Sequence, residues 1–325
     1  MKILFWGETE GNVGPANINR GIAADLSERF RRVTSRGKYR ELAAALCLLL
    51  PSDAVVVSGL SWKGVILVGA AKLLGKRSVY LMHGCAEQEY RCNGVEPDAR
   101  CLAQEAFLLK HCDLILPVSR RYMLWFREQY PRFANKTDYL CNGVDTRLFA
   151  RQQSRDKMPG SVAVAGGLTP LKNNLAVARA VEDLEGKACL RIYGGEKQPL
   201  PGKYRYTEQV GKLANGEFLE QLSATGLFVL NSLLESFSIA AVEALACGCS
   251  LLISEKAGVA DLLALEETDV IHDPMDVEEI RSKIGYLLEH PNHHRLRSQF
   301  DPEAWSFKVM AENLENKCAA LVCSR

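Results

Sequence analysis

Two glutamates with seven residues between them, Glu235 and Glu243, mark the part of this chain best suited to chemistry. Glu243 falls in an otherwise apolar, alanine-rich run, where a carboxylate is unfavourable to bury without hydrogen-bond donors. The two hydroxyls of a ribose would satisfy both of its oxygens. Glu235 precedes the expected helix, whose N-cap is Ser238, and a helix N-terminus suits phosphate. The simpler alternative is an exposed Glu243 and a Glu235 that only assists capping.

A second candidate is a turn in which an apolar run meets Gly166 and Gly167 and then a helix entered by Lys172. Glycines let a backbone approach a ligand closely, and a lysine brings a point charge to a diphosphate. Gly194 opens a similar turn after the next apolar run. The alternative is a solvated lysine near a helix start.

Short apolar runs alternate with segments of helical periodicity along the chain. The predicted strands lie near 2–6, 54–58, 77–82, 113–118, 136–141, 161–165, 188–193, 226–231, 250–254 and 269–272. The predicted helices lie near 16–29, 64–75, 98–111, 120–130, 172–184, 216–224, 239–247 and 276–290. This alternation indicates two doubly wound α/β domains with parallel sheets, 1–150 and 151–325. The last helix, near 302–322, could pack back on the first domain.

The order and spacing of these motifs resemble the retaining GT-B glycosyltransferases of family 4, which include glycogen and sucrose synthases. The family's Glu-x7-Glu pattern matches Glu235 and Glu243, and its glycine–lysine turn matches Gly166 to Lys172. Its hinge motif matches residues 142–149, NGVDTRLF. The resemblance covers nearly the whole chain. It implies two Rossmann-like domains facing across a cleft, with the donor domain at 151–325.

The resemblance also implies a role for each matching residue. Lys172, Glu235 and His83 would be catalytic, with Lys172 on the donor diphosphate and the other two near the transferred sugar. Glu243 would bind the ribose. The remaining donor-binding residues would be Gly14, Gly166, Gly167, Gly194, Ser236, Phe237, Ser238 and Ile239. Asn12 and Val13, in a glycine loop after the first strand, would lie on the acceptor side.

Three positions depart from the family pattern. One is Asp261, which replaces the usual glutamate after the Ala257-Gly258 turn. Gly167 stands where the family usually has arginine, which removes one diphosphate contact. Ser238 stands where glycine is common, which crowds the phosphate side.

The implied reaction moves a sugar from a nucleotide-diphosphate donor, with UDP-sugars expected, to a glycan or lipid-linked acceptor with retention of configuration. We expect no metal or other cofactor, because no Asp-x-Asp follows a strand in a place to hold Mg²⁺. No side chain is an obvious nucleophile. The alternatives are a non-catalytic partner that binds a nucleotide sugar and a GT-B-like sugar-nucleotide epimerase. The glycines after the first strand do not form the GxGxxG pattern of NAD enzymes.

The net charge of +1 gives no reason to expect a nucleic-acid partner. The longest apolar run, 42–50, is too short to span a bilayer, so we expect a cytoplasmic protein. Two basic clusters suggest peripheral contact with the anionic inner face of a membrane. They contain Arg29, Arg31, Arg32, Arg36, Lys38 and Arg40, and Arg120, Arg121, Tyr122, Trp125, Phe126 and Arg127. Both could instead be solvated faces.

Overall fold

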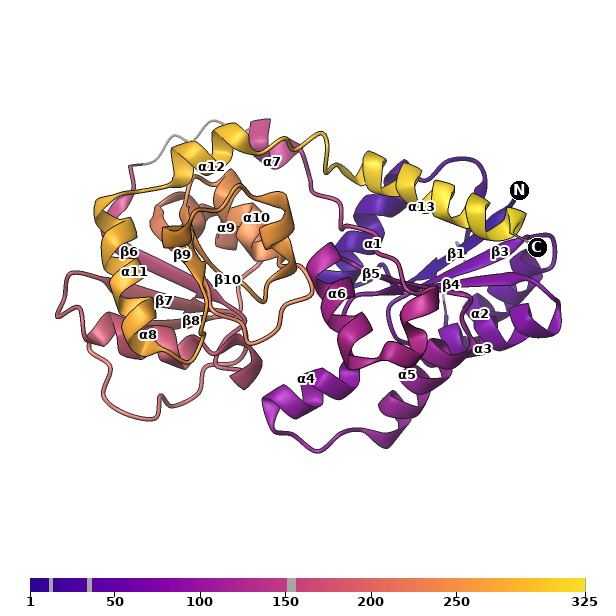
Figure 1. Ribbon diagram of the computed structural model, residues 1–325, viewed down its shortest axis with the longest axis horizontal. Helices are drawn as coiled ribbons and strands as arrows, with labels where there is room; N and C mark the ends of the chain where they lie inside the picture. The colour runs from indigo at the N-terminus through magenta and orange to yellow at the C-terminus, as the bar shows by residue number, and fades with distance from the viewer. Residues whose placement is uncertain (12–13, 34–36, 151–155, 325) are drawn as a thin grey trace. The chain divides into compact units, whose positions relative to one another are not determined.

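A computed structural model describes residues 1–11, 14–33, 37–150 and 156–324 (Figure 1). Its contacts divide the chain into two compact units. The first unit contains Met1–Arg91, Val95–Asp145 and Glu303–Arg325, and the second contains Cys92–Gly94 and Thr146–Pro302. The carboxyl-terminal segment therefore belongs to the first unit.

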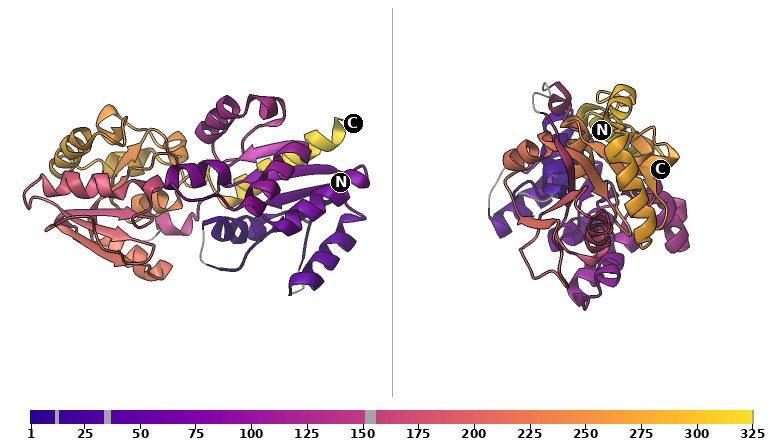
Figure 2. Two further views of the ribbon diagram at one scale, coloured as in Figure 1. Left: turned by 90° about the horizontal axis from the view of Figure 1, so that it is seen from below. Right: turned by 90° about the vertical axis from the view of Figure 1, so that its left-hand side faces the viewer.

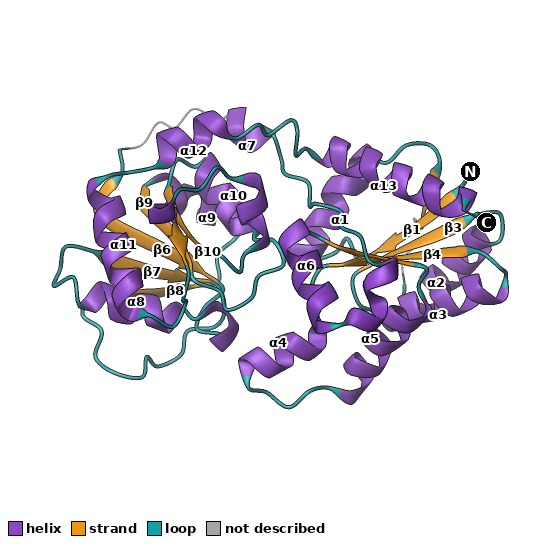
Figure 3. Cartoon of the chain, viewed as in Figure 1, coloured by secondary structure: helices purple, strands orange, loops and turns teal. Residues whose placement is uncertain are grey.

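The first unit has a five-stranded parallel sheet in the order β2-β1-β3-β4-β5. Its strands are β1 (Ile3–Gly7), β2 (Phe30–Arg32), β3 (Ala54–Ser58), β4 (Arg77–Met82) and β5 (Leu114–Pro117). Every residue of β3 is buried, as expected for a central strand with both faces covered. Figure 3 shows these strands between helices. The helices are α1 (Gly14–Asp25), α2 (Lys38–Leu49), α3 (Trp62–Leu73), α4 (Ala86–Asn93), α5 (Ala99–His111), α6 (Arg120–Gln129) and α13 (Phe307–Cys323).

Serine and aspartate caps determine where several helices begin. Ser61 accepts from Gly64 N, Ser119 from Tyr122 N, and Asp98 from two amides at the start of α5. Each cap satisfies amides that have no partner inside the helix.

The predicted strand at 136–141 is wrong. Residues Pro131–Lys136 form a 3-10 helix, and only Thr137 bridges to β5. The following residues run beside β5 and donate from Asp138 N and Leu140 N, but they form no strand. The Arg127 side chain donates a hydrogen bond from Nε to Thr137 O at 3.1 Å. This contact uses an acceptor that a continuing ladder would need.

Helix α13 packs against α1 of the first unit, as Figures 1 and 2 show. Two glycines make room for its first residue, Phe307. A Cβ on Gly21 would lie 2.2 Å from the Phe307 ring, and one on Gly143 would lie 2.7 Å from Phe307 Cα. Val144 N also donates to Trp305 O at 2.8 Å.

The second unit has a six-stranded parallel sheet in the order β11-β10-β9-β6-β7-β8. Its strands are β6 (Met158–Ala165), β7 (Cys189–Tyr193), β8 (Thr207–Gly211), β9 (Thr225–Leu230), β10 (Ser250–Ser254) and β11 (Val270–Ile271). The helices are α7 (Arg147–Ala150), α8 (Asn174–Glu182), α9 (Asn215–Ser223), α10 (Ile239–Ala246), α11 (Val277–Glu289) and α12 (His293–Gln299). Helices α8 and α11 share an apolar core with the central strands. The predicted pair of doubly wound α/β domains is therefore confirmed.

Candidate functional site

Two glycine turns lie side by side at the carboxyl edge of the second sheet, after β6 and β7. Gly166, Gly167 and Gly194 have positive φ angles of 95°, 65° and 85°. Gly167 N donates to Tyr193 O at 2.9 Å, which joins the turns. These conformations favour glycine, so the backbone at this edge carries no side chains that would cover it.

Asn174 holds the first turn in shape, which the sequence reasoning missed. Its buried amide donates to Ala165 O at 3.0 Å and to Gly167 O at 2.6 Å. The preceding residue, Asn173, has a left-handed φ of 49°. Paired asparagines before a helix were the available signal, because asparagine tolerates this conformation and bonds locally to the backbone.

The structure brings Lys172 and Glu235 together. Lys172 ends the short 3-10 helix Pro170–Lys172, and its Nζ forms an ion pair with Glu235 Oε2. The Lys172 and Glu235 side chains are 26% and 12% exposed. Glu235 N donates to Lys256 O and Gly258 N to Glu235 O, so the backbone around the carboxylate is fixed. A cation and a carboxylate thus face each other beside the glycine turns.

Helix α10 begins beside Glu235, as predicted. Ser238 is its N-cap and accepts from Ala241 N at 3.4 Å. Phe237 is buried, and its carbonyl accepts from Val259 N. Ser236 and Ile239 flank this turn. The helix N-terminus therefore opens next to the Lys172–Glu235 pair with its partial positive charge.

Ser238 has a φ of 88° and a ψ of 92°, which is unfavourable for any residue with a Cβ. The glycine that the family pattern commonly has here would adopt this conformation without strain. We expect Ser238→Gly to stabilise the folded protein by about 1 kcal/mol, since a glycine N-cap is only a few tenths of a kcal/mol worse than serine. Urea unfolding measures the change. Ser306→Gly, at an N-cap with φ −65°, is the control and should destabilise.

Glu243 lies inside α10 and is 9% exposed. Asn215, an exposed residue at the start of α9, donates from Nδ2 to Glu243 Oε1 at 2.8 Å. Burial raises the pKa of Glu243, and this hydrogen bond offsets part of the rise. Asn215 is a second residue that the sequence reasoning missed. The arrangement is a buried carboxylate under one exposed amide.

Gly167 has no room for the arginine that the family pattern places there. A Cβ at this position would lie 2.8 Å from Gly194 O, and φ is 65°. We therefore expect Gly167→Arg to destabilise the protein by about 2 kcal/mol. Thermal unfolding tests this, with Gly216→Ala as control, because a Cβ there meets nothing within 4 Å. Equal melting temperatures for Gly167→Arg and wild type would contradict the prediction.

In the first unit, His83 follows β4 and joins a short hydrogen-bonded chain. Its Nε2 lies 2.8 Å from Ser58 Oγ, and Ser58 donates to Asn19 Oδ1 at 2.5 Å. Asn19 Nδ2 donates to Glu8 O, which fixes the orientation of the amide. Ser58 must therefore accept from His83, so the proton lies on Nε2 and Nδ1 is left as an acceptor.

Burial lowers the pKa of His83 to about 4. A lowered histidine pKa means that stability is complete above the unfolded value of about 6.5 and is lost as the pH falls toward 4. We expect His83→Gln to reduce the drop in melting temperature between pH 7 and pH 4.5 relative to wild type. Parallel pH dependences for the two proteins would contradict the prediction.

Gly14 begins α1, close in sequence to the end of β1. The other two predicted residues of this loop, Asn12 and Val13, lie outside the described residues. Their predicted place on the acceptor side therefore stays a prediction.

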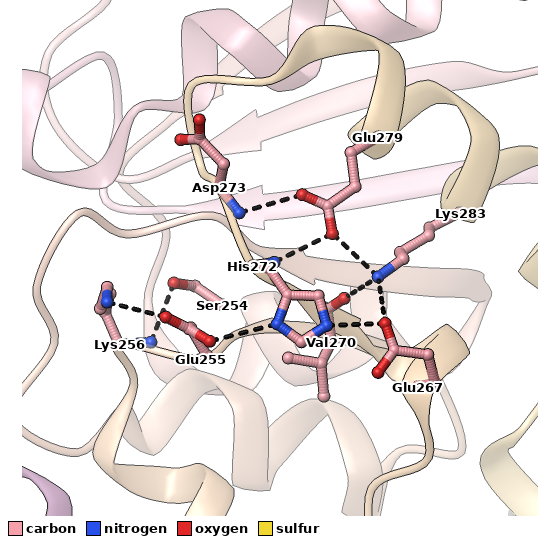
Figure 4. Close-up of polar contacts among 9 residues, drawn as sticks. All are labelled: Ser254, Glu255, Lys256, Glu267, Val270, His272, Asp273, Glu279 and Lys283. Atoms are coloured by element: carbon pink, nitrogen blue, oxygen red, sulfur yellow. Dashed lines mark hydrogen bonds and ion pairs between the residues drawn. The ribbon is translucent and has the colours of Figure 1, made fainter.

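The loop after β11 forms part of the same edge of the second sheet. Pro274 O accepts from Asn173 Nδ2 at 2.6 Å and from Asn231 Nδ2 at 3.0 Å. Figure 4 shows the start of this loop, where His272 lies between Glu255 and Glu267. Hydrogen bonds that the His272 ring donates to these two carboxylates raise the pKa of His272. Polar contacts on both sides thus hold the loop against the lysine turn.

Within the described ranges, no three His, Cys, Asp or Glu side chains are grouped so that they could hold a metal ion. Across the same residues, no helix is long and apolar enough to cross a bilayer.

The two units, each a parallel sheet wrapped by helices, define the GT-B class of fold. HepE of Anabaena, solved in complex with UDP and with UDP-glucose, superposes with a TM-score of 0.69 at 15% identity for the UDP complex. That match covers 98% of this chain and 100% of HepE. Sucrose-phosphate synthase of Thermosynechococcus elongatus gives a TM-score of 0.70 at 15% identity over 100% of both chains.

Residues 145–304 match the family described as glycosyl transferases group 1. Sucrose synthase 5 of Arabidopsis thaliana is 29% identical over 34% of this chain and 13% of its own length. The MMP alpha-(1->4)-mannosyltransferase of Mycolicibacterium hassiacum is 27% identical over 47% of this chain and 40% of its own length. The matches thus span well under two thirds of the length of either relative. The predicted resemblance is confirmed at the level of group 1 for residues 145–304.

Proposed function

We propose that this protein is a glycosyltransferase that moves a sugar from a nucleotide-diphosphate donor to a glycan or lipid-linked acceptor. The observation that carries the proposal is the Lys172–Glu235 pair beside bare glycine turns and the start of α10, within a group 1 domain. A cation, open backbone and a helix N-terminus together suit a diphosphate.

Different residues of the second unit contact different parts of the donor. Lys172 and the first amides of α10 neutralise the diphosphate, and they stabilise it as a leaving group. Glu243 accepts from the ribose hydroxyls, with the Asn215 amide moving aside or sharing the carboxylate. Glu235, held by Lys172 in the free protein, contacts the sugar near its anomeric carbon.

Transfer proceeds with retention of the anomeric configuration. In this proposal no metal ion takes part. The acceptor hydroxyl attacks the anomeric carbon on the face that the leaving phosphate departs from. The bond from that carbon to the phosphate oxygen breaks, the bond to the acceptor oxygen forms, and the acceptor proton passes to the phosphate. His83, neutral at pH 7, offers Nδ1 to a sugar hydroxyl.

UDP is the donor nucleotide that we propose, because HepE, a protein of the same fold, was solved with UDP and UDP-glucose. A thermal-shift screen against UDP-, GDP-, ADP-, CMP- and dTDP-sugars tests this, since a ligand that binds the folded state raises the melting temperature. Stabilisation by UDP and a UDP-sugar is expected. An unchanged melting temperature with all five classes of nucleotide sugar would contradict the proposal.

A non-catalytic partner that binds a nucleotide sugar is the second candidate, because Gly167 leaves the diphosphate without the family's arginine. Release of UDP from a bound UDP-sugar in the presence of acceptor glycans separates the two. Tight binding with no transfer and no hydrolysis favours the binding partner. Conversion of one UDP-sugar into another, seen by NMR, would instead indicate an epimerase.

Cytoplasmic location and peripheral contact with an anionic membrane stay proposals. Of the predicted basic clusters, Arg36 lies outside the described residues and Arg29 pairs with Glu315. In the aromatic cluster, Tyr122 and Phe126 are buried. Much of this second cluster therefore belongs to the core of the first unit.

A further inference from the structure

Three leucines are exposed at the carboxyl ends of α2 and α3. Leu50, Leu73 and Leu74 are 62%, 90% and 47% exposed. The two helices pack together, and Lys76 Nζ donates to Leu50 O at 2.8 Å, which ties the two ends. Single exposed leucines are ordinary, whereas a group of them marks an interaction surface.

A cluster of lysines lies beside these leucines. Lys72 Nζ is 3.0 Å from His111 Nδ1, and Lys136 Nζ donates to Lys110 O at 2.9 Å. Burial, followed by the charges of these three lysines, lowers the pKa of His111. Asp113, the nearby carboxylate, accepts from Ser78 and pairs with Arg77. Among the residues that the structure describes, neither Lys72 nor Lys110 forms an ion pair with a carboxylate, whereas Asp113 compensates part of the charge of Lys136.

This leucine–lysine end lies away from the candidate site of the first unit. Helices α2, α3 and α5 finish just before β3, β4 and β5 begin. Because the strands are parallel, the surface lies at the amino edge of the sheet. Ser58 and His83 lie at the opposite, carboxyl edge. The surface is thus open to a partner that leaves His83 uncovered.

We propose that the leucine–lysine end, formed by Leu50, Leu73, Leu74, Lys72, Lys110 and Lys136, docks the protein on an anionic lipid surface. The leucines would enter the boundary between headgroups and acyl chains, and the lysines would contact lipid phosphates. A second copy of the chain fits less well, because a twofold interface would place the same lysines against each other.

Cosedimentation of the whole protein with vesicles tests the proposal. We expect binding to an equal mixture of phosphatidylcholine and phosphatidylglycerol, weak binding to phosphatidylcholine alone, and release by salt. Leu74→Gln and Leu73→Gln should each lower the partition coefficient about tenfold. Lys72→Gln combined with Lys110→Gln should lower it by about tenfold or more.

The matched control is Leu124→Gln, because Leu124 on α6 is 47% exposed, as Leu74 is. It should bind vesicles like wild type. An equal loss with Leu124→Gln, or equal binding to both kinds of vesicle, would overturn the proposal. So would a dimer, seen by light scattering without vesicles, that Leu73→Gln dissociates. UDP affinity, measured by calorimetry, should be the same in every variant, so failure of docking and failure of the nucleotide site are distinguishable.

Discussion

Glu243→Ala is expected to weaken UDP binding by about 100-fold or more, because in the proposed complex its carboxylate accepts two hydrogen bonds from ribose hydroxyls, which contribute about 1.5–3 kcal/mol each. The carboxylate is buried, with Asn215 as the donor found in the free protein. Isothermal titration calorimetry measures the change. Glu312→Ala, which removes an exposed carboxylate on α13, is the charge-matched control and should bind UDP like wild type.

Replacing Glu243 should have the opposite effect on stability. Loss of the carboxylate weakens UDP binding but should stabilise the ligand-free protein. Burial raises the pKa of Glu243, so its ionisation destabilises the ligand-free fold. A raised carboxyl pKa gives stability that is present at low pH and is lost as the pH rises through the folded value. Glu243→Gln should therefore melt higher than wild type at pH 7, with the difference shrinking toward pH 4. Tighter UDP binding in this variant, or a lower melting temperature at pH 7, would contradict the assignment.

Lys172→Ala is expected to lower kcat by about 100- to 1000-fold, the usual effect of removing one group that stabilises a developing negative charge. It should also weaken UDP binding more than UMP binding, because the proposed role places the ammonium of Lys172 on the second phosphate. Lys256→Ala is the control, since Lys256 lies near Glu235 in the fold but pairs with Glu255. Equal losses for UMP and UDP would count against the role.

The ion pair adds a second measurement to this prediction. Removing Lys172 leaves Glu235, whose side chain is 12% exposed, without its cation. Lys172→Ala should therefore destabilise the protein more than the double variant Lys172→Ala/Glu235→Ala. The double-mutant cycle in urea isolates this coupling. Additive effects would show that the pair makes no contribution to stability in the free protein.

The strands were predictable wherever local pattern was enough. Runs such as residues 54–58 and 250–254 are mostly apolar, and the structure buries every residue of them in interior strands. The segment 136–141 is similarly apolar in part, yet it pairs with a neighbour on one side and gives Thr137 O to Arg127. Whether a segment becomes a strand depends on free partners, which local sequence does not specify.

The sequence predicted most members of the candidate site, though not Asn174 or Asn215, because glycines, a lysine and glutamates at fixed spacing follow strands whose carboxyl ends share one edge. Which of these residues meet depends on the tertiary structure. It paired Lys172 with Glu235, placed Asn215 over Glu243, and used the Asn174 amide to hold the glycine turn.

The physical reason is that most of these contacts join segments far apart in the chain, and their geometry depends on how the strands are ordered in the sheet. Spacing along the sequence cannot predict such contacts, whereas the two glutamates need only the loop and helix that carry them. Spacing thus specified Glu235 and Glu243 as a pair, and packing gave each a different partner.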